Sequence, residues 1–283
     1  MLVLLSFMAC VTTMVDRFTI DRVLREGLVV PDTGTACALG ESLTHVLAAT
    51  STESKRPNLA LIISEGTSGI CAQKQAWHYV LEEEIQKKLP LDNSNRIAQI
   101  KDAKINAQRW HALSSSRFYR AFLAAEAEFG LFGEECPVIK EKDEVAYFVA
   151  LISGTFAVLH DKSSGGQIGV PMQVLPKIAR ASECLDAERW WEVPTALQSG
   201  IWASVPGSGP EGVDGWPLLL EAAEKGAQSG VRVAWGIAAL LASNGDQEEI
   251  LVQALEAHGK SLTEVEADPK WLFFDQYATE VSL

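Results

Sequence analysis

No stretch of 18 or more apolar residues occurs in the 283-residue sequence, and no internal repeat, low-complexity segment or long linker is present. A membrane-spanning helix needs about 20 mostly apolar residues, so none is predicted. The first 15 residues are apolar, but they end before Asp16 and lack the basic start of a signal peptide. Phe7–Cys10 resembles a lipoprotein cleavage site, although no Lys or Arg precedes it. These absences predict a cytoplasmic protein whose N-terminal stretch forms a buried strand or helix.

Cysteines are few, scattered and odd in number: Cys10, Cys37, Cys71, Cys136 and Cys184. Small secreted domains that rely on disulfides carry a dense and usually even set of cysteines. The sparse pattern here therefore predicts free thiols in a reducing compartment, in agreement with a cytoplasmic location.

Complete catalytic and metal-binding motifs are also missing. Gly207–Gly212 matches GxGxxG, but no convincing strand precedes it, and Glu211 would repel a pyrophosphate. The histidines do not form HExxH or HxxxH, the spacings that place zinc ligands on one helix face. They are His45, His78, His111, His160 and His258. No metal and no cofactor is predicted.

The composition is that of a globular protein with a sizeable core, with 47% apolar and 22% charged residues. The net charge of −13 argues against indiscriminate binding to nucleic acid or to anionic membranes. The charge is uneven, because residues 205–283 contain 13 acidic and 4 basic residues, a balance of −9. A local basic surface elsewhere in the chain remains compatible with these numbers.

Such a surface is predicted on residues 94–125, which follow a helical pattern. Between Arg96 and Arg120 there are six basic residues and one acidic residue, a balance of +5. Ser114–Ser116 is expected to bend or break the helix, because short hydroxyl side chains compete for backbone hydrogen bonds. One interpretation is an ordinary exposed face; the other is a surface for phosphates, with Trp110 available to stack on a base. The basic residues opposite the apolar side, or at its edge, are Lys101, Lys104, Arg109, Arg117 and Arg120.

The predicted fold class is α+β, predominantly helical. Residues 1–175 are expected to form an α+β domain with a short strand at 59–64 and a hairpin within 145–160, where Ser153–Gly154 would be the turn. A helix buried on all sides is the alternative for 145–160. Residues 176–283 show helical periodicity almost throughout and are expected to form an acidic helical bundle.

A loop after the predicted hairpin, Lys162–Gly166, combines a lysine with two serines and two glycines. This composition is typical of a turn, and it is also suited to contact a nucleic-acid backbone through Lys162, Ser163 and Ser164. The same serines lie close in sequence to His160, so an ester or amide hydrolase is an alternative.

Two cysteines lie in stretches that each keep one end of a CxxC zinc knuckle: Thr35–Glu41, which contains Cys37, and Ile70–Lys74, which contains Cys71. The order of these stretches resembles the large-subunit protein of type IV CRISPR complexes, in which two complete knuckles occur. Two cysteines alone cannot close a zinc site, so no zinc is predicted.

The resemblance implies a non-catalytic subunit of a nucleoprotein complex used in antiviral defence. It would contact guide RNA and target DNA beside the recognition motif, with the acidic bundle packed against other protein subunits and no membrane involved. A helical protein–protein adaptor is the third hypothesis.

Overall fold

The computed structural model describes residues 28–50, 56–89 and 94–282, and every helix and loop discussed below lies within these ranges. The predictions for the apolar N-terminal stretch and for Cys10 lie outside the described residues. The α-helices are α3 Thr33–Thr50, α4 Pro57–Lys88, α5 Ser94–Phe129, α6 Glu144–Ser164, α7 Val174–Ala181, α8 Val193–Ser204, α9 Gly215–Ala227, α10 Val233–Asn244, α11 Glu248–Glu264 and α12 Leu272–Val281. Two short 3₁₀ helices, Glu141–Asp143 and Ser182–Cys184, precede α6 and follow α7.

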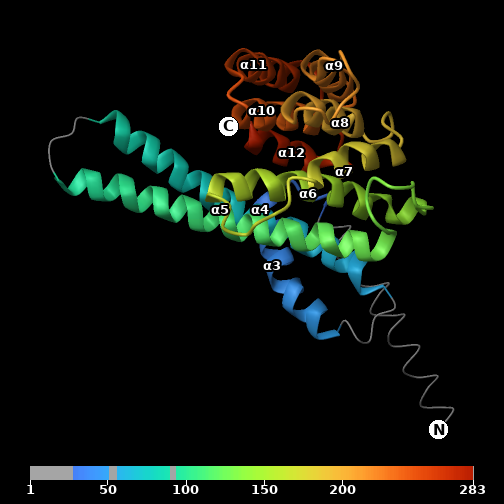
Figure 1. The fold of residues 1–283 in the computed structure, drawn as a ribbon, viewed down its shortest axis with the longest axis horizontal. Helices are drawn as coiled ribbons and strands as arrows, with labels where there is room; N and C mark the ends of the chain where they lie inside the picture. The colour runs from blue at the N-terminus through green and yellow to red at the C-terminus, as the bar shows by residue number, and fades with distance from the viewer. Residues whose placement is uncertain (1–27, 51–55, 90–93, 283) are drawn as a thin grey trace, which may run out of the picture.

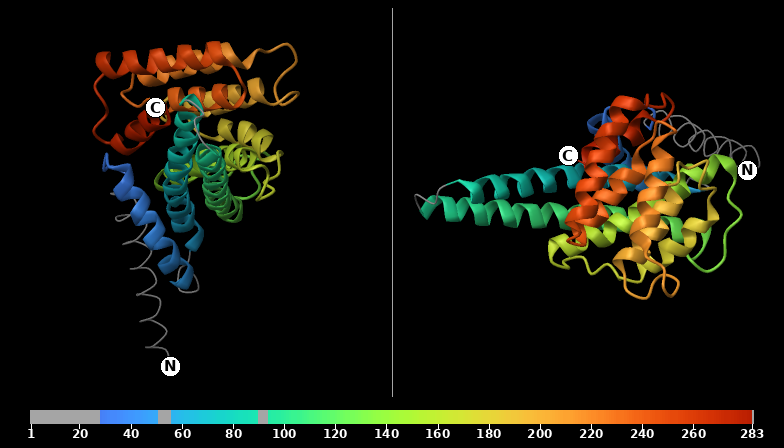
Figure 2. Two further views of the ribbon diagram at one scale, coloured as in Figure 1. Left: turned by 90° about the vertical axis from the view of Figure 1, so that its left-hand side faces the viewer. Right: turned by 90° about the horizontal axis from the view of Figure 1, so that it is seen from above.

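The helices form stacked layers around α6, which packs against α4 and α5 on one side and α7 on another (Figure 1). Helices α8 to α12 form a further layer, and α3 crosses α4 at the opposite side of the molecule. The long hairpin of α4 and α5 extends well beyond the other helices, as Figure 1 and the right-hand view of Figure 2 show. The outer half of this hairpin is therefore exposed on nearly every side.

The predicted strands are wrong, because the described part of the chain contains no strand. Residues 59–64 belong to α4 and 145–160 belong to α6. Every residue from Ala146 to Asp161 in α6 is buried, so no polar stripe marks a helical period. Gly154 does not form a turn; its missing side chain lets Phe122 and Ile178 approach, since a Cβ there would lie 2.8 Å from each.

Helix α6 is also the one helix in the described ranges that is long and apolar enough to cross a membrane. Within its most apolar window, 89% of the residues are buried inside the protein. The central helix of a water-exposed bundle has this character, so the apolar composition of α6 is explained by its position in the core.

One further local prediction is corrected by the structure. Helix α5 continues through Ser114–Ser116 without a break. Ser114 donates from Oγ to the Gly69 carbonyl of α4 at 3.0 Å, and Ser115 donates to the Ala157 carbonyl of α6 at 2.8 Å. These hydroxyls join neighbouring helices and leave the backbone of α5 intact.

The helices predicted beyond residue 176 are confirmed, with shifts at their ends. The hydrophobic core is one cluster that includes Ile63 and Leu151 from the first part of the chain and Leu197 and Phe274 from the second. Helix α11 continues through Gly259 and Ser261, and Ser261 accepts a hydrogen bond from a buried arginine, Arg232.

Candidate functional site: a helical arm with an alanine seam

The projecting half of the α4–α5 hairpin is called here the arm and comprises residues 72–89 and 94–111 (Figure 1). The hydrogen bond between Ser114 and Gly69 sets the register of the two antiparallel helices at its base. Because both helices rise equally per residue, Ala76 lies level with Ala107. Residues further along each helix pair in the same way toward the tip.

Small side chains form the seam between the two helices of the arm. Ala76 is fully buried, and Ala103 and Ala107 are almost fully buried. Large apolar residues occupy the outside, where Leu81 is 60% exposed and Ile105 is 45% exposed. This is the reverse of an ordinary amphipathic hairpin, in which the large apolar residues fill the seam.

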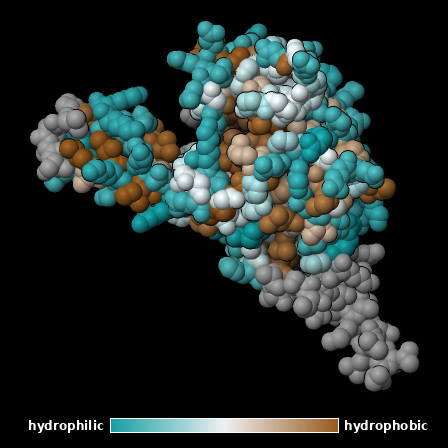
Figure 3. All heavy atoms as spheres, in the orientation of Figure 1, coloured by the Kyte–Doolittle hydropathy of each residue, from teal (hydrophilic) through white to brown (hydrophobic). Residues whose placement is uncertain are grey.

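The exposed apolar residues continue toward the tip of the arm, with Ile85, Leu89 and Ile97 between 43% and 50% exposed. Figure 3 shows brown, apolar side chains along the arm among teal, polar ones. Single exposed apolar residues are common on protein surfaces, whereas a series of them on one projecting element makes that element a candidate interaction site.

Three of the predicted basic residues lie on the arm. Lys101, Lys104 and Arg109 are exposed, and none of them forms an ion pair with any residue that the structure describes. Their charges are therefore available to an external partner. Together with Ile105 they give the outer side of α5 an apolar centre with basic edges.

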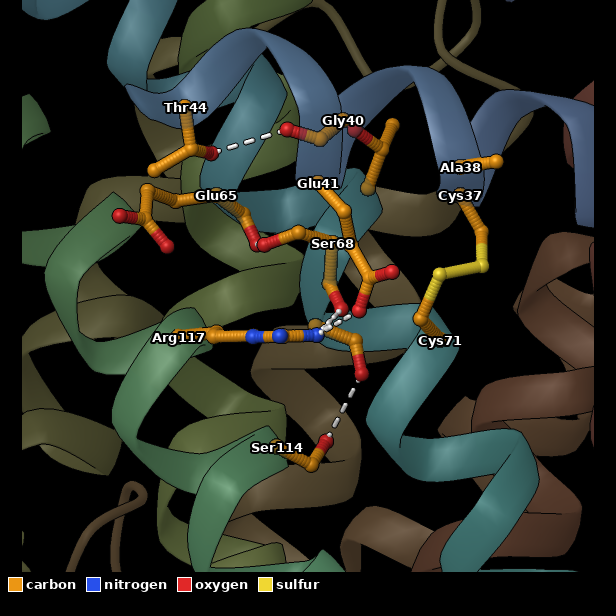
Figure 4. Close-up of polar contacts among 12 residues, drawn as sticks. Cys37, Ala38, Gly40, Glu41, Thr44, Glu65, Ser68, Cys71, Ser114 and Arg117 are labelled. Atoms are coloured by element: carbon orange, nitrogen blue, oxygen red, sulfur yellow. Dashed lines mark hydrogen bonds and ion pairs between the residues drawn. A yellow bond between two sulfur atoms is a disulfide. The ribbon is translucent and has the colours of Figure 1, made fainter. Parts of the chain in front are cut away.

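The other two basic residues of α5 lie at the base of the arm and are used inside the protein. Arg117 contacts Glu41 of α3 at 2.6 Å and donates to the Ser68 carbonyl at 2.8 Å (Figure 4). Arg120 binds both carboxylate oxygens of Glu65, each at 2.8 Å. Bidentate pairs of this kind are among the stronger charged hydrogen bonds. The structure thus divides the predicted basic strip into an exposed outer part and a paired inner part.

Beside Arg117, a disulfide joins Cys37 of α3 to Cys71 of α4 (Figure 4). A second disulfide joins Cys136 to Cys184. The prediction of free thiols is therefore wrong for four of the five cysteines. The paired cysteines are 34 and 48 residues apart in sequence, so no short sequence motif predicts the two disulfides.

The positions where a complete zinc knuckle would have its second cysteine have other contacts. At Gly40 a Cβ would lie 2.8 Å from the Ser64 carbonyl, so glycine allows α3 to cross α4 closely. Lys74 donates to Thr33 at 2.9 Å and forms an ion pair with Glu280 at 3.2 Å. In the described ranges no three His, Cys, Asp or Glu residues lie close enough together to hold a metal ion.

The predicted loop at Lys162 is the end of α6. Lys162 donates to the Asn244 carbonyl at 2.8 Å, and Ser163 donates to Leu159 at 3.1 Å. Ser164 is buried and donates to the Asp161 carbonyl at 2.7 Å. All three side chains thus have partners inside the protein and do not join the cations of the arm.

His160 does not contact these serines. Its Nδ1 lies 2.7 Å from Nδ1 of His111, so one ring donates and the other accepts in the buried pair. Burial lowers the pKa of His111 to about 4, and burial together with His111 lowers the pKa of His160 well below its usual value. The pair is therefore neutral at pH 7 and joins α5 to α6. Among the described residues no hydrogen bond joins the His160 ring to Ser163 or Ser164, so the hydrolase alternative has no support from these residues.

Comparison of the chain with protein-family models, with curated proteins and with solved structures finds no match.

The sequence patterns did not predict that large apolar residues lie on the outside of the arm. A signal was present: alanines recur four residues apart at 72 and 76 and at 103 and 107, while Leu81 and Ile105 lie off that stripe. Helical periodicity was interpreted with the large residues inside, which is the usual arrangement. Only the register of α4 against α5 shows that alanines occupy the seam.

Proposed function

We propose that the protein is a non-catalytic docking protein that binds a partner protein through its arm. The observation that carries this proposal is the reversed seam, with alanines inside and leucines and isoleucines outside. Full burial of one Leu or Ile side chain contributes roughly 1.5–3 kcal/mol. A partner that covers Ile105 on the outer side of α5, or Leu81 and Ile85 on the outer side of α4, would gain a substantial part of that at each position it covers.

The chemistry of the arm indicates the kind of partner. An amphipathic helix of a partner can lie along a row of exposed apolar residues, because its own apolar residues recur at helical spacing on one face. Lys101, Lys104 and Arg109 border Ile105 and favour acidic residues at the edges of that partner helix. The proposed partner is therefore a helix with an apolar face flanked by Asp or Glu.

The two disulfides support a location in an oxidising compartment, because disulfides persist there and are rare in the cytosol. This proposal replaces the cytoplasmic location expected from the cysteine count. It also fits a docking role better than a role beside guide RNA.

Photocrosslinking in the cells that encode the protein tests the docking proposal. With a photoreactive amino acid at Leu81 or Ile105, we expect a crosslink to one partner of defined mass, attached within an amphipathic acidic helix. The matched control is Val252 of α11, which is 47% exposed on the body and should give no such product. An Ile85→Glu change should remove the Leu81 crosslink. Equal labelling from Leu81, Ile105 and Val252 would contradict the proposal. So would crosslinks from the arm that reach only RNA, lipid or a second copy of this chain.

A nucleic-acid-binding subunit is the second candidate function, favoured by the three unpaired cations on α5. If Lys101, Lys104 and Arg109 each neutralise one phosphate of duplex DNA, affinity should fall about 40-fold between 50 and 200 mM salt. Fluorescence anisotropy with labelled RNA and DNA measures this. Lys101→Glu with Lys104→Glu should abolish binding, whereas Arg120→Gln, at a residue paired with Glu65, should leave the affinity unchanged. Absence of binding at 50 mM salt would exclude this candidate.

A further inference from the structure

A cavity of 460 Å³ opens on the body, away from the arm. It lies between the start of α6, the turn at Arg189–Trp190 and the residues just before α12. Its volume falls within the range of small-molecule pockets, about 300–1,000 Å³. None of the residues in the proposed docking arm contributes to it.

Two tryptophans form a fixed wall of this cavity. Trp190 is buried and stacks on Phe148 with ring centroids 4.6 Å apart, and its indole nitrogen donates to Glu144 at 3.1 Å. Trp271 lies 5.7 Å from Trp190 and 5.0 Å from Trp191 between ring centroids. Because these rings are held by packing and by a hydrogen bond, the apolar wall exists before any ligand arrives, which lowers the entropic loss on binding.

Three basic residues surround the wall. Arg189 is neutralised, since it contacts Glu141 at 2.9 Å and Glu144 at 3.3 Å. Lys142 and Lys270 have no carboxylate partner among the residues that the structure describes, and both border the cavity. Lys270 places its ammonium group 4.9 Å from the centre of the Trp271 ring. The two carboxylates exceed Arg189 by one charge, so with Lys142 and Lys270 the border of the aromatic surface carries a net charge of +1, in a chain whose net charge is −13.

We propose that this cavity binds a small organic anion with a flat apolar body, such as an aromatic carboxylate. The apolar body would lie against Trp190 and Trp271, and the carboxylate would lie between Lys142 and Lys270. A cationic ligand would be repelled by the two lysines. The carboxylate of Glu141 is occupied by Arg189 and would not attract a cation in their place.

Isothermal titration calorimetry with 2-naphthoate tests this site, with 2-naphthamide as the neutral analogue and 2-naphthylmethylamine as the cationic one. We expect naphthoate to bind most tightly and the amine to give no measurable binding. Lys142→Gln with Lys270→Gln should weaken naphthoate roughly tenfold and leave the amide unchanged, since exposed ion pairs contribute up to about 1 kcal/mol each. Trp271→Ala should weaken naphthoate and the amide alike.

The matched control is Lys260→Gln on α11, an exposed lysine that forms an ion pair with Glu264, which should leave naphthoate affinity unchanged. Thermal unfolding of each variant shows whether the fold is retained, and Leu81→Glu on the arm should not alter naphthoate binding. The proposal is overturned if naphthoate does not bind at millimolar concentration, if the lysine variant binds it as tightly as the original protein, or if the amine binds equally well.

Discussion

Replacing Arg232 with methionine should lower the free energy of unfolding by about 3–5 kcal/mol, because it leaves the carboxylate of Asp275 buried without its partner. Arg232 is 1% exposed and contacts Asp275 through Nη1 at 2.7 Å. It also donates through Nε to Ser261 Oγ at 2.8 Å and through Nη2 to the Ser261 carbonyl at 2.9 Å. One side chain thus connects the start of α10, the end of α11 and the first turns of α12.

Urea unfolding followed by circular dichroism measures this loss. The matched control is Lys260→Met on α11, where an exposed side chain changes and the expected effect is within about 0.5 kcal/mol. Changing both partners, Arg232→Met with Asp275→Leu, should recover much of the lost stability, because no buried charge then remains unpaired. A loss below about 1 kcal/mol for Arg232→Met alone would show that water reaches Asp275 and that the network contributes little.

Most of the helices that sequence patterns predicted correctly have one apolar side. Helices α7, α9 and α11 each have a buried and an exposed side, and α10 is buried almost throughout but is short and lies between Gly230 and Gly245, so periodicity and these glycines located them. Helix α6 has no exposed side over most of its length, and its β-branched and aromatic residues then favoured strands. The wrong fold class follows from that one element and from the short apolar run at the start of α4.

The candidate site was predictable only in part. Charge counting found the basic residues of α5, but it could not separate Lys101 from Arg117, because the difference depends on Glu41 in another helix. The same limit applies to the cysteines, since α3 and α4 bring Cys37 and Cys71 together only after they cross at Gly40. Properties that depend on which helices are neighbours are not present in local sequence.

The helices around the base of the arm are joined by more covalent and polar contacts than the two helices of the arm itself. The Cys37–Cys71 disulfide, the Arg117–Glu41 pair and the Arg120–Glu65 pair lie close to one another on α3, α4 and α5. The buried His111–His160 pair adds a link from α5 to α6. A projecting element needs such a base, because its own alanine seam buries little apolar area. The disulfide can be removed from this base without leaving a buried charge.

Removing either disulfide should lower the free energy of unfolding by about 3–4 kcal/mol, because loops of 34 and 48 residues are no longer closed in the unfolded chain. The paired changes Cys37→Ser with Cys71→Ser and Cys136→Ser with Cys184→Ser test each one separately in urea. Adding a reductant to the original protein opens both disulfides and should give a loss close to the sum of the two, and it should have no effect on a variant that lacks all four cysteines.

The variant without the Cys37–Cys71 disulfide and the variant without the Cys136–Cys184 disulfide should lose local stability in different parts of the protein. Amide hydrogen exchange should accelerate in α3 and at the base of the arm in the first variant, and around residues 136 and 184 in the second. Thiol titration of the unfolded, unreduced protein should find at most one free thiol, because four of the five cysteines are paired. Five free thiols in protein isolated from its own cells would contradict both the disulfides and the oxidising compartment, and would restore the reducing environment expected from the cysteine count.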